Sequence, residues 1–413
     1  MLKRARYHIA VFFSVIGPGF ITAVVDNDAG GIFTYSQAGA RWGYLPLWTL
    51  LPITLLLIVT QEMCSRMGAV TGKGLSDLIR EEFGLRTTFF MMITLLVANF
   101  TNVMANFAGI ASSLELFHVS RYISVPLAAV AVWLLIVKGT YERVEKVFLF
   151  ATSLYVCYVI SGFLVKPDWK EAAIYSVRPV LLFDPDYITM LIAMVGTSVA
   201  PWMQFYLQAA VVEKGVTAKE YVESRIEVIV GCIVMSVIAF FIIVACAGAI
   251  GAVAPRDIEN AADAALALKP FGEYAFLLFA AGLFNASIFA ATILPLSTAY
   301  TVCEGLGFES GVNRRFREAP IFYWLFTLLI VFGAGVVLLP EFPLIQMILL
   351  SQVINGVLLP VVLIFMVLLV NKKNLMKEWI NSRGYNVITW ISVALIIGLT
   401  LALVAISIRD MVR

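Results

Sequence analysis

The sequence predicts an all-α integral membrane protein of eleven transmembrane helices, folded as a single domain over residues 1–413. Two observations predict this class. Hydrophobic residues make up 61% of the chain and charged residues 14%, with a mean hydropathy of +0.93, whereas a soluble domain has roughly 45–50% apolar and about 25% charged residues. The apolar excess also runs through the whole chain instead of forming one anchor. The bilayer is therefore the expected solvent for most of the molecule.

The individual spans follow from the length of helix that a bilayer requires. About 20 apolar residues cross a hydrocarbon core that is about 30 Å thick. The candidate spans are 9–38, 45–63, 88–117, 122–138, 147–165, 187–212, 227–250, 274–300, 320–339, 344–370 and 387–408. The N-terminal segment lacks the small-residue cleavage site of a signal peptide, so we expect it to be retained as the first span.

The distribution of basic residues predicts the orientation. Cytoplasmic loops carry an excess of Lys and Arg, and with the N-terminus inside, 20 of the 29 Lys and Arg residues fall on the cytoplasmic side. The other nine are Arg41, Arg121, Lys166, Lys170, Arg178, Arg256, Lys269, Arg409 and Arg413. We expect a multi-pass protein of the plasma membrane with a cytoplasmic N-terminus and an extracytoplasmic C-terminus.

Two spans are interrupted by residues that do not continue a helix: the first at 26–31 (DNDAGG) and the sixth at 196–201 (GTSVAP). Five spans separate them, so they hold equivalent positions if 9–165 and 187–370 are inverted repeats and 387–408 is an extra helix. Paired interruptions of this kind indicate a midplane site in secondary transporters. Unwound backbone at that depth survives only where it lines a cavity or is covered by protein.

The two acidic residues of the first interruption are the strongest indication of a functional site. An Asp at the centre of a transmembrane helix costs about 2.5–3.5 kcal/mol on insertion scales, and Asp26 and Asp28 lie two positions apart. The sixth span contains no Lys or Arg to neutralise them. They are expected to serve an ion, a proton or a counter-charge. The alternative is that 26–31 is an extracellular loop between two short apolar pieces.

The other polar groups of the apolar runs are expected to be structural. Amide side chains form interhelical hydrogen bonds in membranes, which is our expectation for Asn99, Asn102, Asn106, Asn285 and Asn355. Glu62 and Glu304 lie at span ends, where we expect solvated or helix-capping roles. The segment 256–270 is expected to form an exposed amphipathic connecting helix. The five Cys are expected to be buried apolar residues, and two His are too few for a His-based metal site.

Six stretches, taken in order and with their spacing, match the motifs of one known family. They are 17–20 (GPGF), 26–29 (DNDA, in place of D-P-G-N), 61–81 (QEMCSRMGAVTGKGLSDLIRE), 196–204 (GTSVAPWMQ, in place of an M-P-H motif), 351–360 (SQVINGVLLP) and 371–376 (NKKNLM). Together they resemble the Nramp family of divalent metal transporters over nearly the whole chain. The resemblance implies a LeuT-like fold of two inverted five-helix repeats, with a metal ion held between the two interruptions.

The resemblance also implies metal ligands at matched positions. Asp26 matches the carboxylate ligand, Thr197 a backbone-carbonyl donor, and Gln352 a tenth-span glutamine that approaches the ion. The full set of candidate metal-site residues is Asp26, Asn27, Asp28, Ala29, Thr197, Ala200 and Gln352. The metal is the transported substrate, so neither a cofactor nor a catalytic residue is expected, and the chain is not expected to be an enzyme.

Departures from the family's metal-binding motifs change the expected ion. The family's metal-binding Asn aligns with Ala29, its Gly with Asp28 and its Met with Ala200. Thioether ligands select softer transition metals, whereas carboxylate, carbonyl and water oxygens suit Mg²⁺ and Mn²⁺. Mg²⁺ keeps several waters and needs a roomy acidic pocket. A shift of three residues in the sixth span, which would bring Met203 to the Met position, is the alternative alignment.

Other departures remove groups that a proton would use. Trp202 stands at the family's His, Asn106 at a third-span Glu, and Val103 or Asn102 at a third-span Asp. The ninth span, 320–339, contains no charged residue. This pattern resembles the Nramp-related magnesium transporters, a branch thought to work without proton coupling.

The sequence therefore predicts uptake of Mg²⁺, and also Mn²⁺, by alternating access without protons. The alternatives are a proton-coupled Mn²⁺/Fe²⁺ importer and an organic-solute carrier of the same fold. An intramembrane aspartyl enzyme is disfavoured, because such enzymes place their two carboxylates close together on separate segments, whereas Asp26 and Asp28 share one. The expected partners are the metal ion and the lipid bilayer of a prokaryotic cell, with no nucleic acid and no obligate protein partner.

Overall fold

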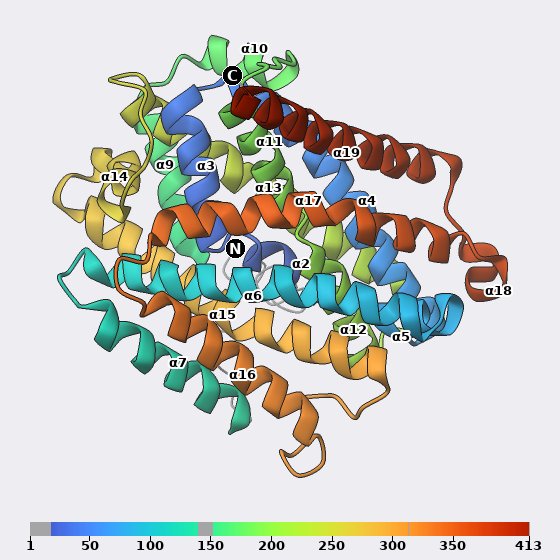
Figure 1. The fold of residues 1–413 in the computed structure, drawn as a ribbon. Coiled ribbons are helices and arrows are strands. Elements are labelled where there is room, and N and C mark those ends of the chain that lie inside the picture. The colour runs from blue at the N-terminus through green and yellow to red at the C-terminus, as the bar shows by residue number, and fades with distance from the viewer. Residues whose placement is uncertain (1–17, 139–151, 313, 413) are drawn as a thin grey trace, which may run out of the picture.

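The computed structural model describes residues 18–138, 152–312 and 314–412, and every regular element within them is helical (Figure 1). Eight helices in this part of the chain are long and apolar enough to cross a membrane, and Arg121–Val137 and Ser153–Leu164 are shorter apolar helices. The start of the predicted first span (9–17) and of the fifth (147–151) lie outside the described residues. The all-α class is confirmed, and the total of eleven spans stays a prediction.

The first predicted span contains two helices, α2 (Pro18–Val25) and α3 (Ala29–Trp42), and the sixth contains α11 (Pro185–Ser198) and α12 (Pro201–Glu213). The other described elements are η1 (Leu45–Thr49), α4 (Leu50–Thr71), α5 (Leu75–Phe83), α6 (Leu85–Glu115), α7 (Arg121–Val137), η2 (Thr152–Tyr155), α9 (Val156–Leu164), α10 (Trp169–Val177), α13 (Tyr221–Cys246), η3 (Ala247–Gly251), α14 (Ala261–Ala265), η4 (Leu266–Tyr274), α15 (Ala275–Leu306), α16 (Pro320–Val337), α17 (Leu344–Val370), α18 (Lys373–Met376), η5 (Lys377–Trp379) and α19 (Arg383–Val412). Both predicted interruptions are confirmed as breaks between helices.

Two expectations about connecting segments are wrong. The second span does not end at residue 63, because α4 continues to Thr71 before Gly72 ends it with a left-handed backbone conformation. The segment 256–270 is not an exposed amphipathic helix. Only Ala261–Ala265 is α-helical there, and Ala264 and Leu268 are fully or almost fully buried. The short apolar side chains of this segment pack against α15 and neighbouring elements instead of facing water.

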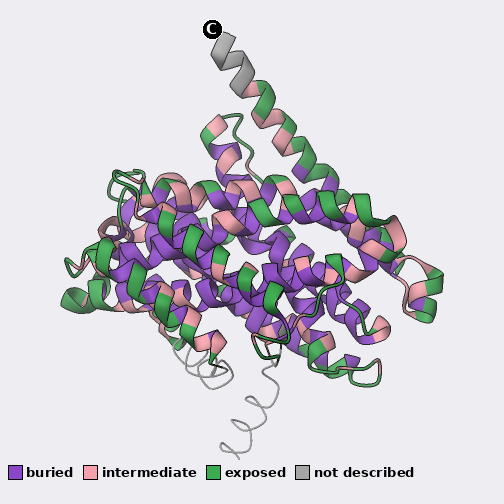
Figure 2. Cartoon of the chain, turned by 60° about the horizontal axis from the view of Figure 1, so that its bottom comes forward, coloured by how far each residue is buried: buried purple, intermediate pink, exposed green. Residues whose placement is uncertain are grey.

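The packing of the long helices leaves the two breaks in the middle of the molecule. Helix α6 packs against α15 and α17, α13 packs against α2, α3 and α4, and α11 packs against α17. Buried residues are concentrated in this central region, and α19 carries mostly exposed and intermediate ones (Figure 2). Large apolar side chains such as Phe90, Leu127, Phe332 and Leu401 are exposed on the outside of the bundle, as expected for a surface that faces lipid.

Connectors assigned to the same side of the membrane contact one another. At the predicted inner end, Arg80 Nη1 donates to the backbone oxygen of Glu304 over 3.0 Å. At the predicted outer end, Arg41 forms ion pairs with Asp186 and, over 3.0 Å, with Asp257. The two ends are therefore separate structural regions, while the assignment of one end to the cytoplasm stays a prediction.

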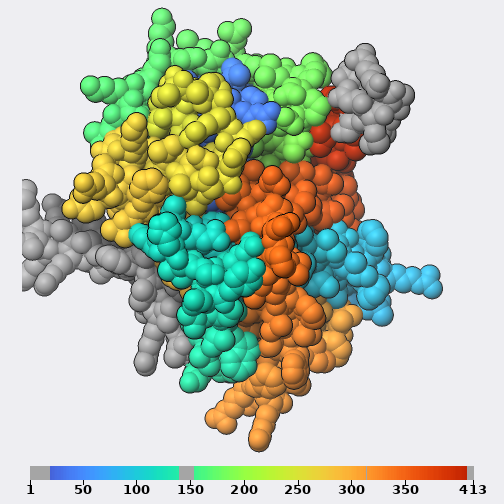
Figure 3. Space-filling view, turned by 60° about the vertical axis from the view of Figure 1, so that its left-hand side comes forward, coloured from blue at the N-terminus to red at the C-terminus, as the bar shows by residue number. Residues whose placement is uncertain are grey.

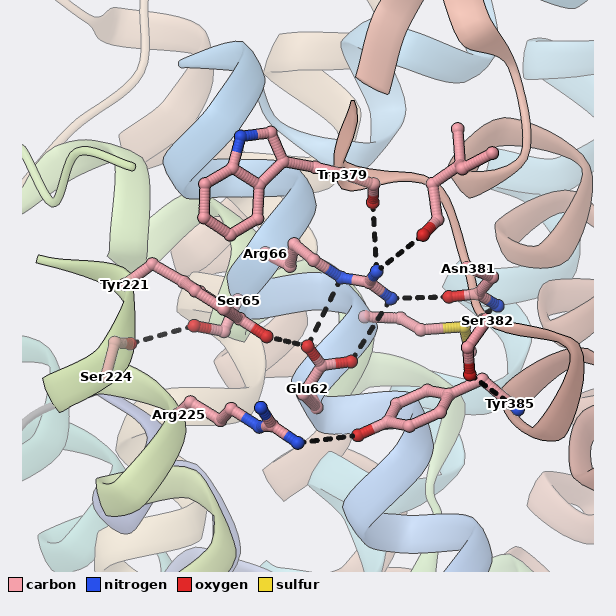
Figure 4. A network of polar contacts seen from close by, with 12 residues as sticks. Glu62, Ser65, Arg66, Tyr221, Ser224, Arg225, Trp379, Asn381, Ser382 and Tyr385 are labelled. Atoms are coloured by element: carbon pink, nitrogen blue, oxygen red, sulfur yellow. Dashed lines mark hydrogen bonds and ion pairs between the residues drawn. The ribbon is translucent and has the colours of Figure 1, made fainter. Parts of the chain in front are cut away.

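Glu62 is not solvated, contrary to the expectation for a residue at a span end. Its side chain is 2% exposed, and its Oε1 lies 3.2 Å from Arg66 Nε in the next turn of α4. The Tyr221 hydroxyl donates to the same carboxylate, and Arg66 also donates to Asn381 and, over 2.9 Å, to the backbone oxygen of Trp379 (Figure 4). This network, which we call the inner network, joins α4, α13 and the connector before α19. Glu62 and Arg66 were missed as buried groups because their charges end the apolar run of the second span.

Candidate cation site

The first break is a buried turn whose geometry is set by Asp28. Residues Asp26, Asn27 and Asp28 are 3%, 0% and 6% exposed, which excludes the alternative of a solvated loop. Asp28 is the N-cap of α3 with an extended backbone, and its Oδ1 accepts a hydrogen bond from Gly31 N over 3.1 Å. Asp is among the residues that best cap a helix in this way. The sequence thus ends α2 and starts α3 inside the protein.

The second break follows from Pro201. Proline has no backbone N–H and is favoured in the first turn of a helix, where that donor is not needed. Helix α11 ends at Ser198, Ala200 has an extended backbone, and α12 begins at Pro201. The last carbonyls of a helix have no partner within it, so α11 presents carbonyl oxygens at the break, including that of Thr197.

Oxygen atoms from both breaks converge on Gly31. A β-carbon at Gly31 would lie 2.8 Å from the backbone oxygen of Asp26, 3.6 Å from Thr197 Oγ1 and 3.7 Å from Asn27 Oδ1. Three oxygens from two segments far apart in the sequence therefore surround one small volume. A side chain at Gly31 would collide with the Asp26 backbone oxygen, so glycine permits the close approach of the two breaks.

Several polar atoms of these residues have no hydrogen-bond partner among the described residues. They are Asp26 Oδ2, Asn27 Oδ1 and Nδ2, and Thr197 Oγ1. Buried polar groups are almost always paired, and exceptions often mark a functional role or a bound ion or water. No ion pair of the described residues includes Asp26 or Asp28. The site therefore combines negative charge with unused oxygen acceptors.

Asn106 of α6 binds Asp28, a contact that sequence reasoning did not find. Asn106 Nδ2 donates to Asp28 Oδ2 over 2.7 Å, and its Oδ1 accepts from Ala29 N over 3.3 Å. The expected interhelical hydrogen bond of Asn106 is confirmed. The only signal for it in the sequence is the spacing of Asn99, Asn102 and Asn106, which places three amides on one face of a helix.

Gln352 of α17 reaches the first break, as expected. A β-carbon at Gly30 would overlap the Gln352 side-chain amide and lie 3.0 Å from Asp28 Oδ1. The amide is thus packed directly against α3 beside the Asp28 carboxylate. Gly30 and Gly31 permit the close approach of these groups.

The remaining predicted residues lie at the edges of this arrangement. The Ala29 side chain points to α6, where a β-carbon at Gly109 would overlap it. Ala200 is 2% exposed and lies at the second break itself. Met203 lies inside α12, where its N–H donates to the Ala200 oxygen over 3.1 Å. The break therefore falls at Val199 and Ala200, and the alignment of Ala200 with the family's Met stays a prediction.

A cavity of about 540 Å³ lies toward the predicted outer end of the molecule. Its walls come from three segments that lie side by side at one face of the molecule, residues 112–122, 258–261 and 342–346 (Figure 3). Ser112 lies six residues from Asn106 on α6, and Gln346 lies six residues from Gln352 on α17. At 1.5 Å per residue, the cavity begins about 9 Å from the site along both helices.

A family model described as "Natural resistance-associated macrophage protein-like" matches residues 19–406. The chain belongs to the Nramp family. The divalent metal cation transporter MntH of Deinococcus radiodurans is 26% identical over 404 residues, covering 93% of this chain and 88% of that protein. MntH of Granulibacter bethesdensis is 24% identical, with 94% of this chain and 87% of that protein covered. The family resemblance and the expectation of a transporter rather than an enzyme are confirmed.

Solved structures confirm the fold of this Nramp chain. The Eremococcus coleocola manganese transporter, in complex with an aromatic bis-isothiourea compound, superposes with a TM-score of 0.73 at 21% identity, covering 94% of this chain and 84% of that one. MhsT, in complex with L-phenylalanine, has a TM-score of 0.61 at 14% identity, with 93% and 98% covered. The predicted LeuT-like architecture is confirmed, and the division into two inverted repeats stays a prediction.

Proposed function

We propose that this Nramp-family divalent cation transporter carries Mg²⁺, with Mn²⁺ as a second substrate, by alternating access and without moving protons. Asp26 and Asp28 supply the negative charge. The Thr197 carbonyl, the Asn27 side chain and Gln352 supply neutral oxygens, and the break at Ala200 keeps the two helix ends apart. Ala29 closes the site toward α6.

The observation that carries this proposal is the convergence at Gly31 of the Asp26 backbone oxygen with Asn27 Oδ1 and Thr197 Oγ1, two oxygens without a partner among the described residues. In the described part of the chain, no three His, Cys, Asp or Glu side chains lie close enough to hold a metal together. A cation bound here would therefore be held by two carboxylates, carbonyls, amides and retained water. Such a set favours Mg²⁺ and Mn²⁺ over softer metals.

The surroundings of Asp28 support transport without protons. Its described partners are the Asn106 amide and the backbone N–H groups of Gly31 and Gly30, and the next polar groups along α6 and α17 are the amides of Asn102 and Asn355. An amide neither takes up nor releases a proton at physiological pH. The titratable neighbours include Asp26 and Tyr155, whose hydroxyl donates to the Asn27 backbone oxygen. The amides along α6 and α17 do not extend these two groups into a chain such as pumps use to move protons.

The second candidate is a proton-coupled manganese importer, and the comparisons favour it. The relatives carry the name divalent metal cation transporter, and the Eremococcus coleocola structure is titled a manganese transporter. In this alternative, the two carboxylates would serve both the metal and the proton. The 21% identity to that structure supports the fold and leaves the ion to be decided by experiment.

The deciding experiment measures Mg²⁺ and Mn²⁺ influx into liposomes with trapped fluorescent indicators, together with the luminal pH. The proposal expects entry of both ions without acidification, and loss of entry in Asp26→Ala. Asp168→Ala is the matched control, because Asp168 caps the exposed helix α10 away from the site. Mn²⁺ entry with acidification and without Mg²⁺ entry would establish the second candidate instead.

A further inference from the structure

We propose that Asn102 and Asn355 are positioning residues that fix the orientation of the Gln352 amide and thereby set how tightly the cation is held. The proposal deepens the proposed function and rests on it only in placing the cation site beside Gln352. The three side chains come from α6 and α17 and are 1–2% exposed. We call them the amide triad.

Asn102 uses all of its hydrogen-bonding capacity. Its Nδ2 donates to the Asn355 Oδ1 over 2.8 Å and to the backbone oxygen of Ala98 over 3.0 Å. Its Oδ1 accepts from Asn355 Nδ2 over 2.9 Å and from Gln352 Nε2 over 3.3 Å. A primary amide has two N–H donors and an oxygen that accepts two bonds. Rotation of Asn102 would therefore break four bonds.

The triad also distinguishes the two ends of the Gln352 amide. Both N–H groups of Gln352 are used, toward Asn102 Oδ1 and, over 2.8 Å, toward Ser351 Oγ. Gln352 Oε1 accepts from Asn355 Nδ2 over 3.0 Å. A reversed amide would place its nitrogen against the Asn355 nitrogen, so two donors would face each other. The oxygen is thus held in one place.

One acceptor position of Gln352 Oε1 has no partner among the described residues. The amide lies against Gly30 beside Asp28, and Nε2 is its atom nearest the position of a Gly30 β-carbon, so the amide as a whole belongs to the boundary of the cation site. An amide held in one orientation contacts a cation or one of its waters without first paying the entropy of becoming ordered. Residues that hydrogen-bond to a metal ligand fix its orientation, and losing one typically lowers metal affinity by about 10–100-fold.

If the amides only held helices together, loss of any one of them should affect cation affinity in the same way. Asn99 of α6 provides a control for this alternative. Asn99 Nδ2 donates to Thr298 Oγ1 over 2.7 Å and joins α6 to α15, while Asn355 joins α17 to α6. Both residues are buried amides on interhelical hydrogen bonds. Only Asn355 contacts Gln352, so only its loss should act on the cation through Gln352.

The test is a double-mutant cycle with Asn355→Leu and Gln352→Ala, with Asn99→Leu as the control. Mn²⁺ and Mg²⁺ binding to the purified protein is measured by calorimetry, and transport KM in liposomes. We expect Asn355→Leu to weaken binding and raise KM by about 10-fold or more. In the Gln352→Ala background it should have little further effect, because residues that act through one another are not additive. Asn99→Leu should leave the affinity unchanged.

Thermal unfolding in detergent separates these effects from misfolding. Asn355→Leu and Asn99→Leu should lower the midpoint similarly, since each breaks a buried interhelical bond. Equal losses of affinity from Asn355→Leu with and without Gln352, or an equal loss in Asn99→Leu, would overturn the positioning role. A wild-type protein that binds Mn²⁺ or Mg²⁺ but transports neither contradicts the proposed function alone, because the cycle is still decided by binding. A wild-type protein that binds neither ion overturns both proposals.

Discussion

The cation site and the inner network both bury carboxylates, but only the inner network pairs its carboxylate with a basic side chain of the described residues. Asp26 has an oxygen without a partner in the described part of the chain. Glu62 lies against Arg66 and accepts a hydrogen bond from Tyr221 (Figure 4). Both carboxylates are almost fully buried, at 3% and 2% exposure. Burial alone therefore does not identify the functional acid, and the partners do.

The difference has a physical basis in the cost of burying charge. An ionised carboxylate in an apolar interior needs a counter-charge and hydrogen bonds. The inner network supplies both from within the protein. The break site gives Asp28 amide and backbone donors, but no basic side chain of the described residues pairs with it, so we expect a cation from outside to complete the site. A basic side chain in the site would compete with the transported cation for the carboxylates.

The largest expected effect is a separation of transport from stability between the two regions. Asp28→Asn keeps the N-cap of α3, since Asn caps helices as well as Asp does, but it removes one charge. We expect divalent cation influx to fall by about 10–100-fold with little change in thermal midpoint. Glu62→Gln should instead lower the thermal midpoint with little change in influx. It leaves the buried Arg66 guanidinium without its counter-charge, which destabilises a protein by about 3–5 kcal/mol.

Influx assays in liposomes and thermal unfolding in detergent, run on both variants, measure this separation. The comparison fails if Glu62→Gln abolishes influx while the protein stays as stable as wild type. In that case, Glu62 would take part in transport, and the inner network would be more than a structural connection.

A smaller effect is expected when both members of the inner pair are replaced. Arg66→Met leaves Glu62 buried without its cation and should destabilise the protein strongly. The double variant Glu62→Leu/Arg66→Met should recover much of the thermal midpoint, because well-packed apolar residues often replace a buried ion pair at little cost. Unfolding curves of the single and double variants provide the coupling. Equal destabilisation in both would mean that the bonds to the α19 connector, through Trp379 and Asn381, dominate.

The same two regions show what could be predicted from the sequence. Both helix breaks follow from local signals, namely the 26–31 segment and Pro201, so they were predicted correctly. The Glu62–Arg66 pair has the i,i+4 spacing of a helix, but the charges made the second span look shorter than it is. The pairing of Asn102 with Asn355 joins residues 253 positions apart. No local pattern encodes such a contact, because it depends on how helices pack.

The smallest effect is expected for an ion pair at the predicted inner end that resembles Glu62–Arg66 only in composition. Lys73 Nζ lies 2.7 Å from Glu81 Oε2, but the two side chains are 45% and 40% exposed. Exposed pairs contribute about 0.2–1 kcal/mol because water and salt screen them. Lys73→Ala should therefore leave influx unchanged and barely move the thermal midpoint. The Gln208 bond to the Lys73 backbone oxygen, 2.9 Å long, does not depend on the side chain. A large loss of influx in this variant would show that surface charges at this end control transport, and burial would then be the wrong criterion for choosing between the two regions.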